Sequence, residues 1–79
     1  MYIDEAIMHI LDNDTSIESQ KDLCTKLGIS APMVSAYKKR ESRPNLHNAS
    51  RIWGLYGIQV EPYTELSLQE EWEYQLSKS

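Results

Sequence analysis

The feature that most constrains this fold is one glycine, Gly28, which separates two stretches of apolar residues at helical spacing. On its N-terminal side, Leu23 and Leu27 stand four residues apart and therefore fall on one face of a helix. A helix can end in a left-handed residue at low cost only where that residue is glycine. The chain is therefore expected to form a helix over 20–27 and to turn sharply at Gly28.

A second short helix is expected directly after this turn. Ser30 can accept a hydrogen bond from a backbone N–H in the first turn of this helix. Pro32 is tolerated in that turn because the N–H that proline lacks would have no partner within the helix. Val34 and Tyr37 are three residues apart and can face the preceding helix. Cys24 is small enough for the helices to approach closely, so we expect it to be buried and inert. The pattern predicts a helix-turn-helix, a unit that mostly binds DNA, and a purely structural hairpin is the alternative.

The chain resembles the Cro/C1-type (XRE) helix-turn-helix family over about residues 3–60. The resemblance rests on residues 22–30, on Val34-Ser35-Ala36-Tyr37, on Arg43-Pro44 and on 52–58. It implies an all-α, five-helix, lambda-repressor-like DNA-binding domain with the helix-turn-helix at helices two and three. The family comprises small dimeric phage and bacterial repressors, antitoxins and other regulators. The resemblance therefore implies a phage-type or prophage-type repressor that binds a double-stranded DNA operator as a homodimer.

Apolar spacing and helix-ending signals predict five helices, over about 3–11, 20–27, 31–39 and 46–56 and from a capping-box pattern at Ser67-Leu-Gln-Glu70 onward. Arg40 stands where the family commonly has glycine, so it either adopts a left-handed conformation or lies in a longer third helix. We favour the longer recognition helix, over 31–40. In the fourth helix Trp53 is expected in the core, Gly54 to make room for that indole or for a partner helix, and Gly57 to end the helix.

Residues 1–60 are expected to form the helix-turn-helix domain, and residues 61–79 a C-terminal acidic helical extension of the same single domain. In this extension Leu68, Trp72 and Leu76 recur every four residues on one side of a helix. The stripe either packs back on its own domain or forms a homodimer interface. The acidic tail also allows an alternative function, an antitoxin-type or other protein-interaction module in which DNA binding is secondary. An anti-repressor or excisionase-like protein that bends DNA is a weaker alternative.

The resemblance implies that the beginnings of the second helix and of the recognition helix face the DNA. Phosphate contacts are expected for Gln20, Lys39 and Arg43, with Lys21 and Arg40 adding charge. The full set of candidate DNA-binding residues is Gln20, Lys21, Ser30, Ala31, Pro32, Ser35, Ala36, Lys38, Lys39, Arg40 and Arg43.

Three of the five positions expected to meet base edges carry no side-chain hydrogen-bonding group, namely Ala31, Pro32 and Ala36. These three can still contact thymine methyl groups, Ser35 can bond a base or a phosphate, and Lys38 or Lys39 can reach guanine. Specificity is therefore expected to rest partly on DNA shape and on half-site spacing.

The net charge of −4 opposes nucleic-acid binding, but the charges are segregated. Four of the eight basic residues lie within 38–43, whereas most acids lie near the two ends of the chain. DNA responds to a local patch because charges are screened beyond a Debye length of about 8–10 Å. An acidic protein can therefore bind DNA through one basic edge, although a charge run can also be no more than a solvated helix end.

The remaining features argue against an enzyme. His9 and His47 have no cysteine or acid at metal-ligand spacing, and the chain has neither a glycine-rich phosphate loop nor a recognisable catalytic triad. We therefore expect no catalytic residue, metal or cofactor. A single cysteine, an acidic N-terminus and the lack of a long apolar run predict a cytoplasmic protein of a bacterial host cell, associated with the nucleoid through DNA and with no membrane partner.

Overall fold

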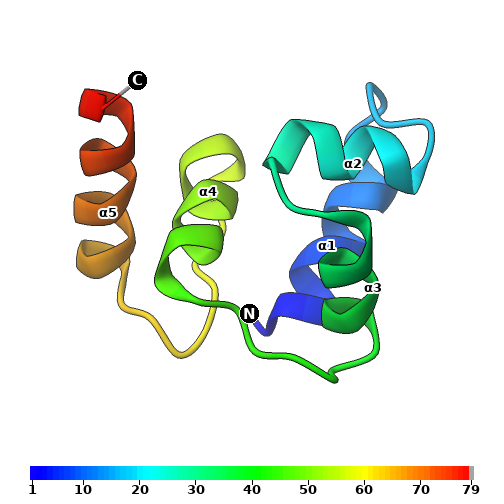
Figure 1. The fold of residues 1–79 in the computed structure, drawn as a ribbon, viewed down its shortest axis with the longest axis horizontal. Helices are drawn as coiled ribbons and strands as arrows, with labels where there is room; N and C mark the ends of the chain where they lie inside the picture. Colours follow the sequence, from blue (N-terminus) through cyan, green and yellow to red (C-terminus); the bar gives the residue numbers. More distant parts are fainter. Residues whose placement is uncertain (79) are drawn as a thin grey trace.

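The computed structural model describes residues 1–78, and this part of the chain contains five helices and no strand. The helices are α1 (Ile3–Asn13), α2 (Gln20–Leu27), α3 (Ala31–Lys38), α4 (Leu46–Tyr56) and α5 (Glu65–Lys78). In Figure 1, α5 lies beside α4 at one edge of the molecule, and α1, α2 and α3 lie on the other side of α4. The Cα radius of gyration is 11.7 Å. The predicted all-helical class is confirmed.

All five helices contribute side chains to one hydrophobic core. The buried face of α1 consists of Ile3, Ala6, Ile7 and Ile10, and Leu11 lies partly buried at its edge. Burying an isoleucine or leucine side chain stabilises the fold by roughly 1.5–3 kcal/mol. Because helices this short are only marginally stable on their own, the shared cluster stabilises them. The core residues are Ile3, Ala6, Ile7, Ile10, Ile17, Leu23, Leu27, Ile29, Val34, Tyr37, Ala49, Ile52, Val60 and Leu68.

Gly28 and Gly57 end α2 and α4 as predicted, Ser30 caps the beginning of α3 as predicted, and Ser19 caps the beginning of α2 in the same way. The hydroxyl of Ser19 accepts from the N–H of Asp22, and that of Ser30 from the N–H of Met33, each at 3.4 Å. Gly28 and Gly57 end α2 and α4 with φ of 67° and 70°, in the left-handed region that glycine adopts cheaply. These local signals therefore set the bounds of the two helices that flank the turn. Cys24 is partly rather than fully buried beside them.

The predicted longer recognition helix is wrong, because α3 ends at Lys38 and Arg40 takes a left-handed conformation with φ of 60°. The N–H of Arg40 donates to the Tyr37 carbonyl at 3.1 Å, and that of Glu41 donates to the Ala36 carbonyl at 2.9 Å. This is the Schellman pattern, with arginine in place of the usual glycine. Left-handed backbone costs a non-glycine residue about 1–2 kcal/mol. The exposed contacts of the Arg40 side chain with Asp4 and Tyr2 offset only part of this cost.

The predicted start of α5 is also wrong. The helix begins at Glu65, and the residue that caps it is Thr64, whose hydroxyl accepts from the N–H of Ser67 at 3.2 Å. Ser67 therefore lies in the first turn of α5 and is not its cap. The earlier start places Leu68 firmly inside the helix, where it is fully buried.

The α5 stripe packs back on its own chain, which was the first of the two alternatives. Leu68 lies in the shared core, and the indole of Trp72 lies directly on Gly54 of α4. Gly54 thus makes room for Trp72 and not for its neighbour Trp53, which packs against the edge of the core. Leu76 is 54% exposed. A dimer interface stays a prediction, and Leu68 has no surface left to offer it.

None of the helices within residues 1–78 combines the length and the apolar character that crossing a membrane requires.

Candidate nucleic-acid interface

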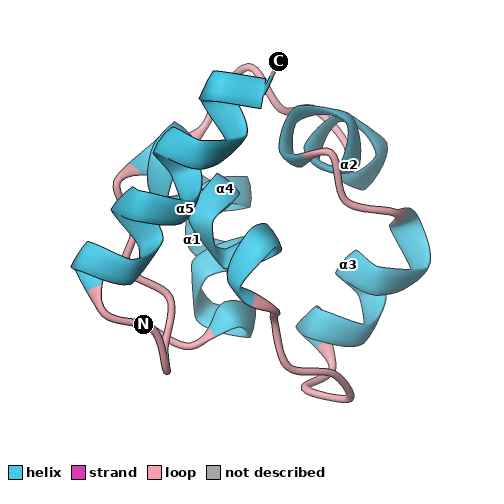
Figure 2. Cartoon of the chain, turned by 60° about the vertical axis from the view of Figure 1, so that its left-hand side comes forward, coloured by secondary structure: helices cyan, strands magenta, loops and turns pink. Residues whose placement is uncertain are grey.

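The structure brings the beginning of α2 and the end of α3 into contact. The ammonium Nζ of Lys38 donates to Oε1 of Gln20 at 3.0 Å, across the pair of helices joined at residues 28–30. The two helices lie together at the edge of the molecule opposite α5 (Figure 2). Because the carbonyl oxygen of the Gln20 amide is occupied by Lys38, its NH₂ group keeps its donors for another partner. Two predicted contact residues are therefore pre-arranged as one polar unit.

The five positions predicted to meet base edges divide into two groups. Ser30, Ala31 and Pro32 are exposed at the beginning of α3, whereas Ser35 and Ala36 are half-buried in its middle. Val34 and Tyr37 turn to the core on the opposite side of the helix. Sequence reasoning missed Met33, which is 36% exposed and three residues from both Ser30 and Ala36. The same helical spacing that singled out its neighbours would have included it.

The basic cluster does not present four free charges. Arg40 donates from Nε to Oδ2 of Asp4 at 2.8 Å, and its guanidinium lies 5.5 Å from the ring centre of Tyr2. This bond from Arg40 lowers the pKa of Asp4, and Asp4 in turn raises the pKa of Arg40. Glu41, an exposed acid, lies within the same run. Of the basic residues predicted to contact DNA, Lys21, Lys38, Lys39 and Arg43 make no ion pair within residues 1–78 and remain available for phosphates.

The turn between α2 and α3 is supported from α4. Nε of Arg51 donates to the backbone carbonyl of Leu27, one of the carbonyls that a helix leaves unpaired at its end. The same guanidinium lies on Gly28, where an added Cβ would stand 2.9 Å from Nη2. Glycine is therefore required at position 28 for two reasons. The backbone there is left-handed, and the Arg51 side chain approaches too closely for a Cβ. On the other side, Asn48 Nδ2 donates to the Tyr37 hydroxyl at 3.0 Å and fixes α3 to α4.

Asp14 directly follows α1 and links it to α2 and α4. Its Oδ2 accepts from Nζ of Lys26 in α2 at 2.8 Å and from the hydroxyl of Tyr56 in α4 at 2.7 Å. Its Oδ1 accepts from the backbone and the hydroxyl of Ser16. The bonds from Lys26, Ser16 and Tyr56 hold the pKa of Asp14 well below its usual range. Asp14 therefore stays ionised and holds the end of α1 to α2 and α4.

The two histidines lie in ordinary surroundings. His9 is beside Asn13 on α1, and Nδ1 of His47 lies 3.8 Å from Glu71 on α5. Among residues 1–78, no group of three or more His, Cys, Asp or Glu side chains is arranged to hold a metal ion.

Comparison of the chain with protein-family models, with curated proteins and with solved structures finds no match in any of the three.

Proposed function

We propose that this chain is a DNA-binding transcriptional regulator of the Cro/C1 (XRE) type, a lambda-repressor-like domain that binds an operator as a homodimer through α3. The observation that carries the proposal is the bond between Gln20 and Lys38. It sets a neutral amide donor and a lysine side by side, next to an α3 whose first three residues are exposed. Such a combination suits a phosphate at the edge of a groove with the helix inside it.

The position of the acidic residues supports this proposal despite the net charge of −4. Four glutamates lie on α5, which Figure 1 places at the opposite edge from α2 and α3. The molecule is 29 Å across its longest axis, which exceeds the Debye length of about 8–10 Å at ordinary salt. The acids of α5 therefore repel a DNA duplex at α3 only weakly.

Readout of bases by α3 is expected to be sparse. The exposed first turn offers one hydroxyl, from Ser30, and the apolar side chains of Ala31 and Pro32. None of these makes the bidentate contacts that discriminate guanine or adenine most strongly. Selectivity then comes from thymine methyl groups, from DNA shape and from the spacing of two half-sites.

Footprinting on DNA that flanks the chain's own gene tests the proposal, because small regulators often control their own promoters. The expected result is protection of two half-sites whose centres lie about 34 Å apart, or a multiple of this spacing. Protection that is equally weak on the flanking DNA and on a shuffled sequence of the same composition would contradict it.

A second candidate function is binding of a protein partner through α5, as in an antitoxin. The observation that favours it is the pair of exposed apolar side chains Leu66 and Tyr74, 64% and 53% exposed among glutamates. Replacing both with glutamate should abolish partner binding without changing DNA affinity. Loss of DNA affinity in that variant would contradict a separate protein-binding surface.

A further inference from the structure

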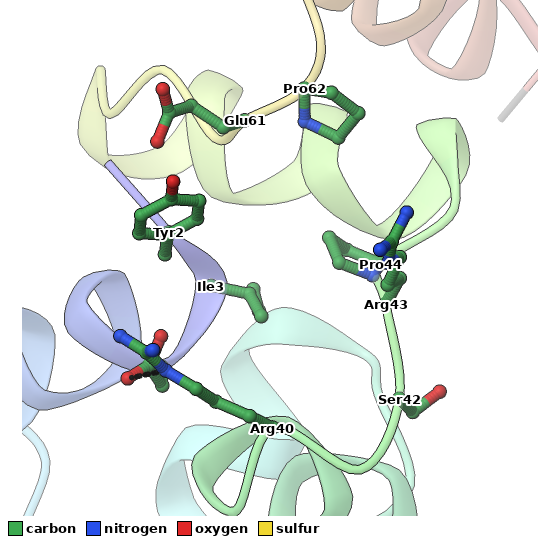
Figure 3. Close-up of a pocket in the computed structure, with 9 residues that line it drawn as sticks. Tyr2, Ile3, Arg40, Ser42, Arg43, Pro44, Glu61 and Pro62 are labelled. Carbon is green, nitrogen blue, oxygen red and sulfur yellow. Dashed lines mark hydrogen bonds and ion pairs between the residues drawn. The ribbon is translucent and has the colours of Figure 1, made fainter.

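A cavity of about 450 Å³ lies beyond the C-terminal end of α3, and of its lining residues only Arg43 takes part in the proposed contact with DNA. It is bounded by the beginning of α1, by the loop between α3 and α4, and by the connection that leads to α5 (Figure 3). Small-molecule sites in proteins typically occupy roughly 300–1,000 Å³, so the cavity is large enough for a ring-sized compound.

Two guanidinium groups line this cavity, and both have unused donors. Arg43 makes no hydrogen bond or ion pair within residues 1–78, and Arg40 uses only Nε, in its bond to Asp4. The planar fork of a guanidinium binds a carboxylate through two parallel hydrogen bonds. In Figure 3 the two groups lie apart, with Ile3 between them, so the Arg43 guanidinium is suited to bind one carboxylate by itself.

The rest of the lining that bears on ligand choice is mostly apolar. Ile3 and Pro44 are buried and form part of the cavity wall. Pro62 and Tyr2 also line the cavity, and the side chain of Tyr2 is 55% exposed. Figure 3 shows the side chain of Ile3 in the middle of this group, between Tyr2 and Arg43. An aromatic ring such as that of Tyr2 stacks well on another flat, apolar body.

The charges of the lining select among anions. Asp4 and Glu61 offset Arg40 and Arg43, so the four side chains sum to no net charge. In Figure 3, Glu61 lies on the opposite side of the cavity from Arg43. A multiply charged phosphate would meet Glu61 as well as the arginines, whereas a single carboxylate can stay beside Arg43 and leave an apolar body near Tyr2.

We propose that this cavity binds a small monocarboxylic acid with a flat apolar body, its carboxylate accepting hydrogen bonds from Arg43 and its ring contacting Tyr2, Ile3 and Pro44. The site goes beyond the proposed function and does not depend on it. If the DNA proposal also holds, such an acid competes with a phosphate for Arg43 and lowers DNA affinity.

Titration of the ¹⁵N-labelled chain, observed by NMR, tests the site with three probes that separate its parts. Benzoate has both the charge and the ring, benzyl alcohol has the ring alone, and inorganic phosphate has the charge alone. The expected result is saturable binding of benzoate below about 10 mM, with shifts at Tyr2 and Arg43, and at least roughly tenfold weaker binding of the other two. Lack of saturation by benzoate, or binding of phosphate as tight as that of benzoate, would overturn the proposal.

Variants show whether the charge acts locally. Arg43→Ala and Arg43→Gln should each weaken benzoate binding by roughly tenfold or more, because a charged hydrogen-bond donor is lost. Lys78→Ala removes the same charge from the end of α5, outside the cavity, and should leave the affinity within about twofold. Equal losses in the Arg43 and Lys78 variants would overturn the site, since only net charge would then matter. The NMR spectrum of each free variant reports whether it is folded, and no DNA is present in the measurement.

Discussion

The indole of Trp72 lies directly against Gly54, and a methyl group on Gly54 would overlap Cδ2 and Cε2 of that ring. Gly54 stands in the last turn of α4, and glycine within a helix costs up to about 1 kcal/mol relative to alanine. The cost is offset by the close approach of α5, which brings Leu68 into the core. Two residues far apart in the sequence thus set the distance between the last two helices.

Gly54→Ala should therefore destabilise the protein, although it raises helix propensity. Forcing a methyl group into this contact is expected to cost about 1–3 kcal/mol, measured as a lower urea midpoint at unchanged slope. In a Trp72→Ala background the ring is absent, so the same change should be neutral or stabilising. A stabilising effect while Trp72 is present would contradict the contact.

The left-handed conformation of Arg40 predicts an order of stability between two variants. Arg40→Gly and Arg40→Ala both lose the bond to Asp4 and the contact with Tyr2, but only alanine keeps a Cβ at φ of 60°. The glycine variant should be more stable than the alanine variant by about 1 kcal/mol in thermal or urea unfolding. Equal stabilities would mean that the third helix lengthens when the guanidinium is removed.

Asp14 predicts a dependence of stability on acid. The pKa of this carboxyl is lowered in the folded state, first by the bond from Lys26, so its stabilising effect is fully present above its ordinary value of 3.8 and is lost as the pH falls toward the folded-state pKa. Asp14→Asn should be less stable than wild type at pH 7, and the difference should shrink below about pH 4. Urea midpoints at a series of pH values measure this.

Asp12→Asn is the matched control for this experiment, because Asp12 is an exposed acid on the same helix that makes no ion pair within residues 1–78. Its difference from wild type should change little with pH. A difference for Asp14→Asn that stays constant from pH 7 to pH 3 would contradict the predicted role of its charge.

The proposed DNA complex should weaken steeply with salt. If a dimer neutralises about six to eight phosphates, the logarithm of affinity falls against the logarithm of salt concentration with a slope of roughly −5 to −7. Arg43→Ala should make that slope shallower by about 1 for each protomer. Fluorescence anisotropy at several salt concentrations gives the slope, and one near zero would contradict phosphate contacts altogether.

Two positions separate affinity from specificity. Arg43 is exposed beyond α3 and is expected to meet a phosphate, so Arg43→Ala should weaken binding to all sequences similarly. Ser35 is half-buried in the middle of α3, and Ser35→Ala should change the preference between operator and random DNA. Competition assays with both DNAs measure the ratio. Equal losses on both DNAs for both variants would overturn this division of roles.

Local signals were enough to predict both ends of α2 and α4 and the beginning of α3. Ser19, Ser30, Gly28 and Gly57 act on their own helix ends, so their effect depends only on near neighbours in the sequence. The start of α5 was harder to predict, because Thr64 and Ser67 are both residue types that commonly cap helices, and only Thr64 does so here. Burial of Leu68 in the core favours the earlier cap, Thr64, and this burial depends on contacts with residues far away in the sequence.

The errors in the predicted site also arise from contacts between residues that lie far apart in the sequence. Arg40 was predicted to extend α3 because arginine disfavours the left-handed region, but Asp4 and Tyr2 lie more than thirty residues earlier in the sequence. The bond between Lys38 and Gln20 likewise joins residues 18 positions apart. Sequence spacing therefore predicted which residues are candidates, but not which of their charges are already paired within the chain.

The hydrogen bond from Arg51 to the Leu27 carbonyl also bears on how this protein can be re-engineered. Residues 19–39 cannot be moved to another protein as an independent unit, because two side chains of α4 support them. Arg51 donates to the carbonyl at their turn, and the Asn48 amide donates to Tyr37. A peptide of this segment, or its transfer to another scaffold, would leave a helix end without its donor. For the proposed DNA complex, new sequence preferences are better introduced by exchanging only the outward side chains of α3, with all five helices retained.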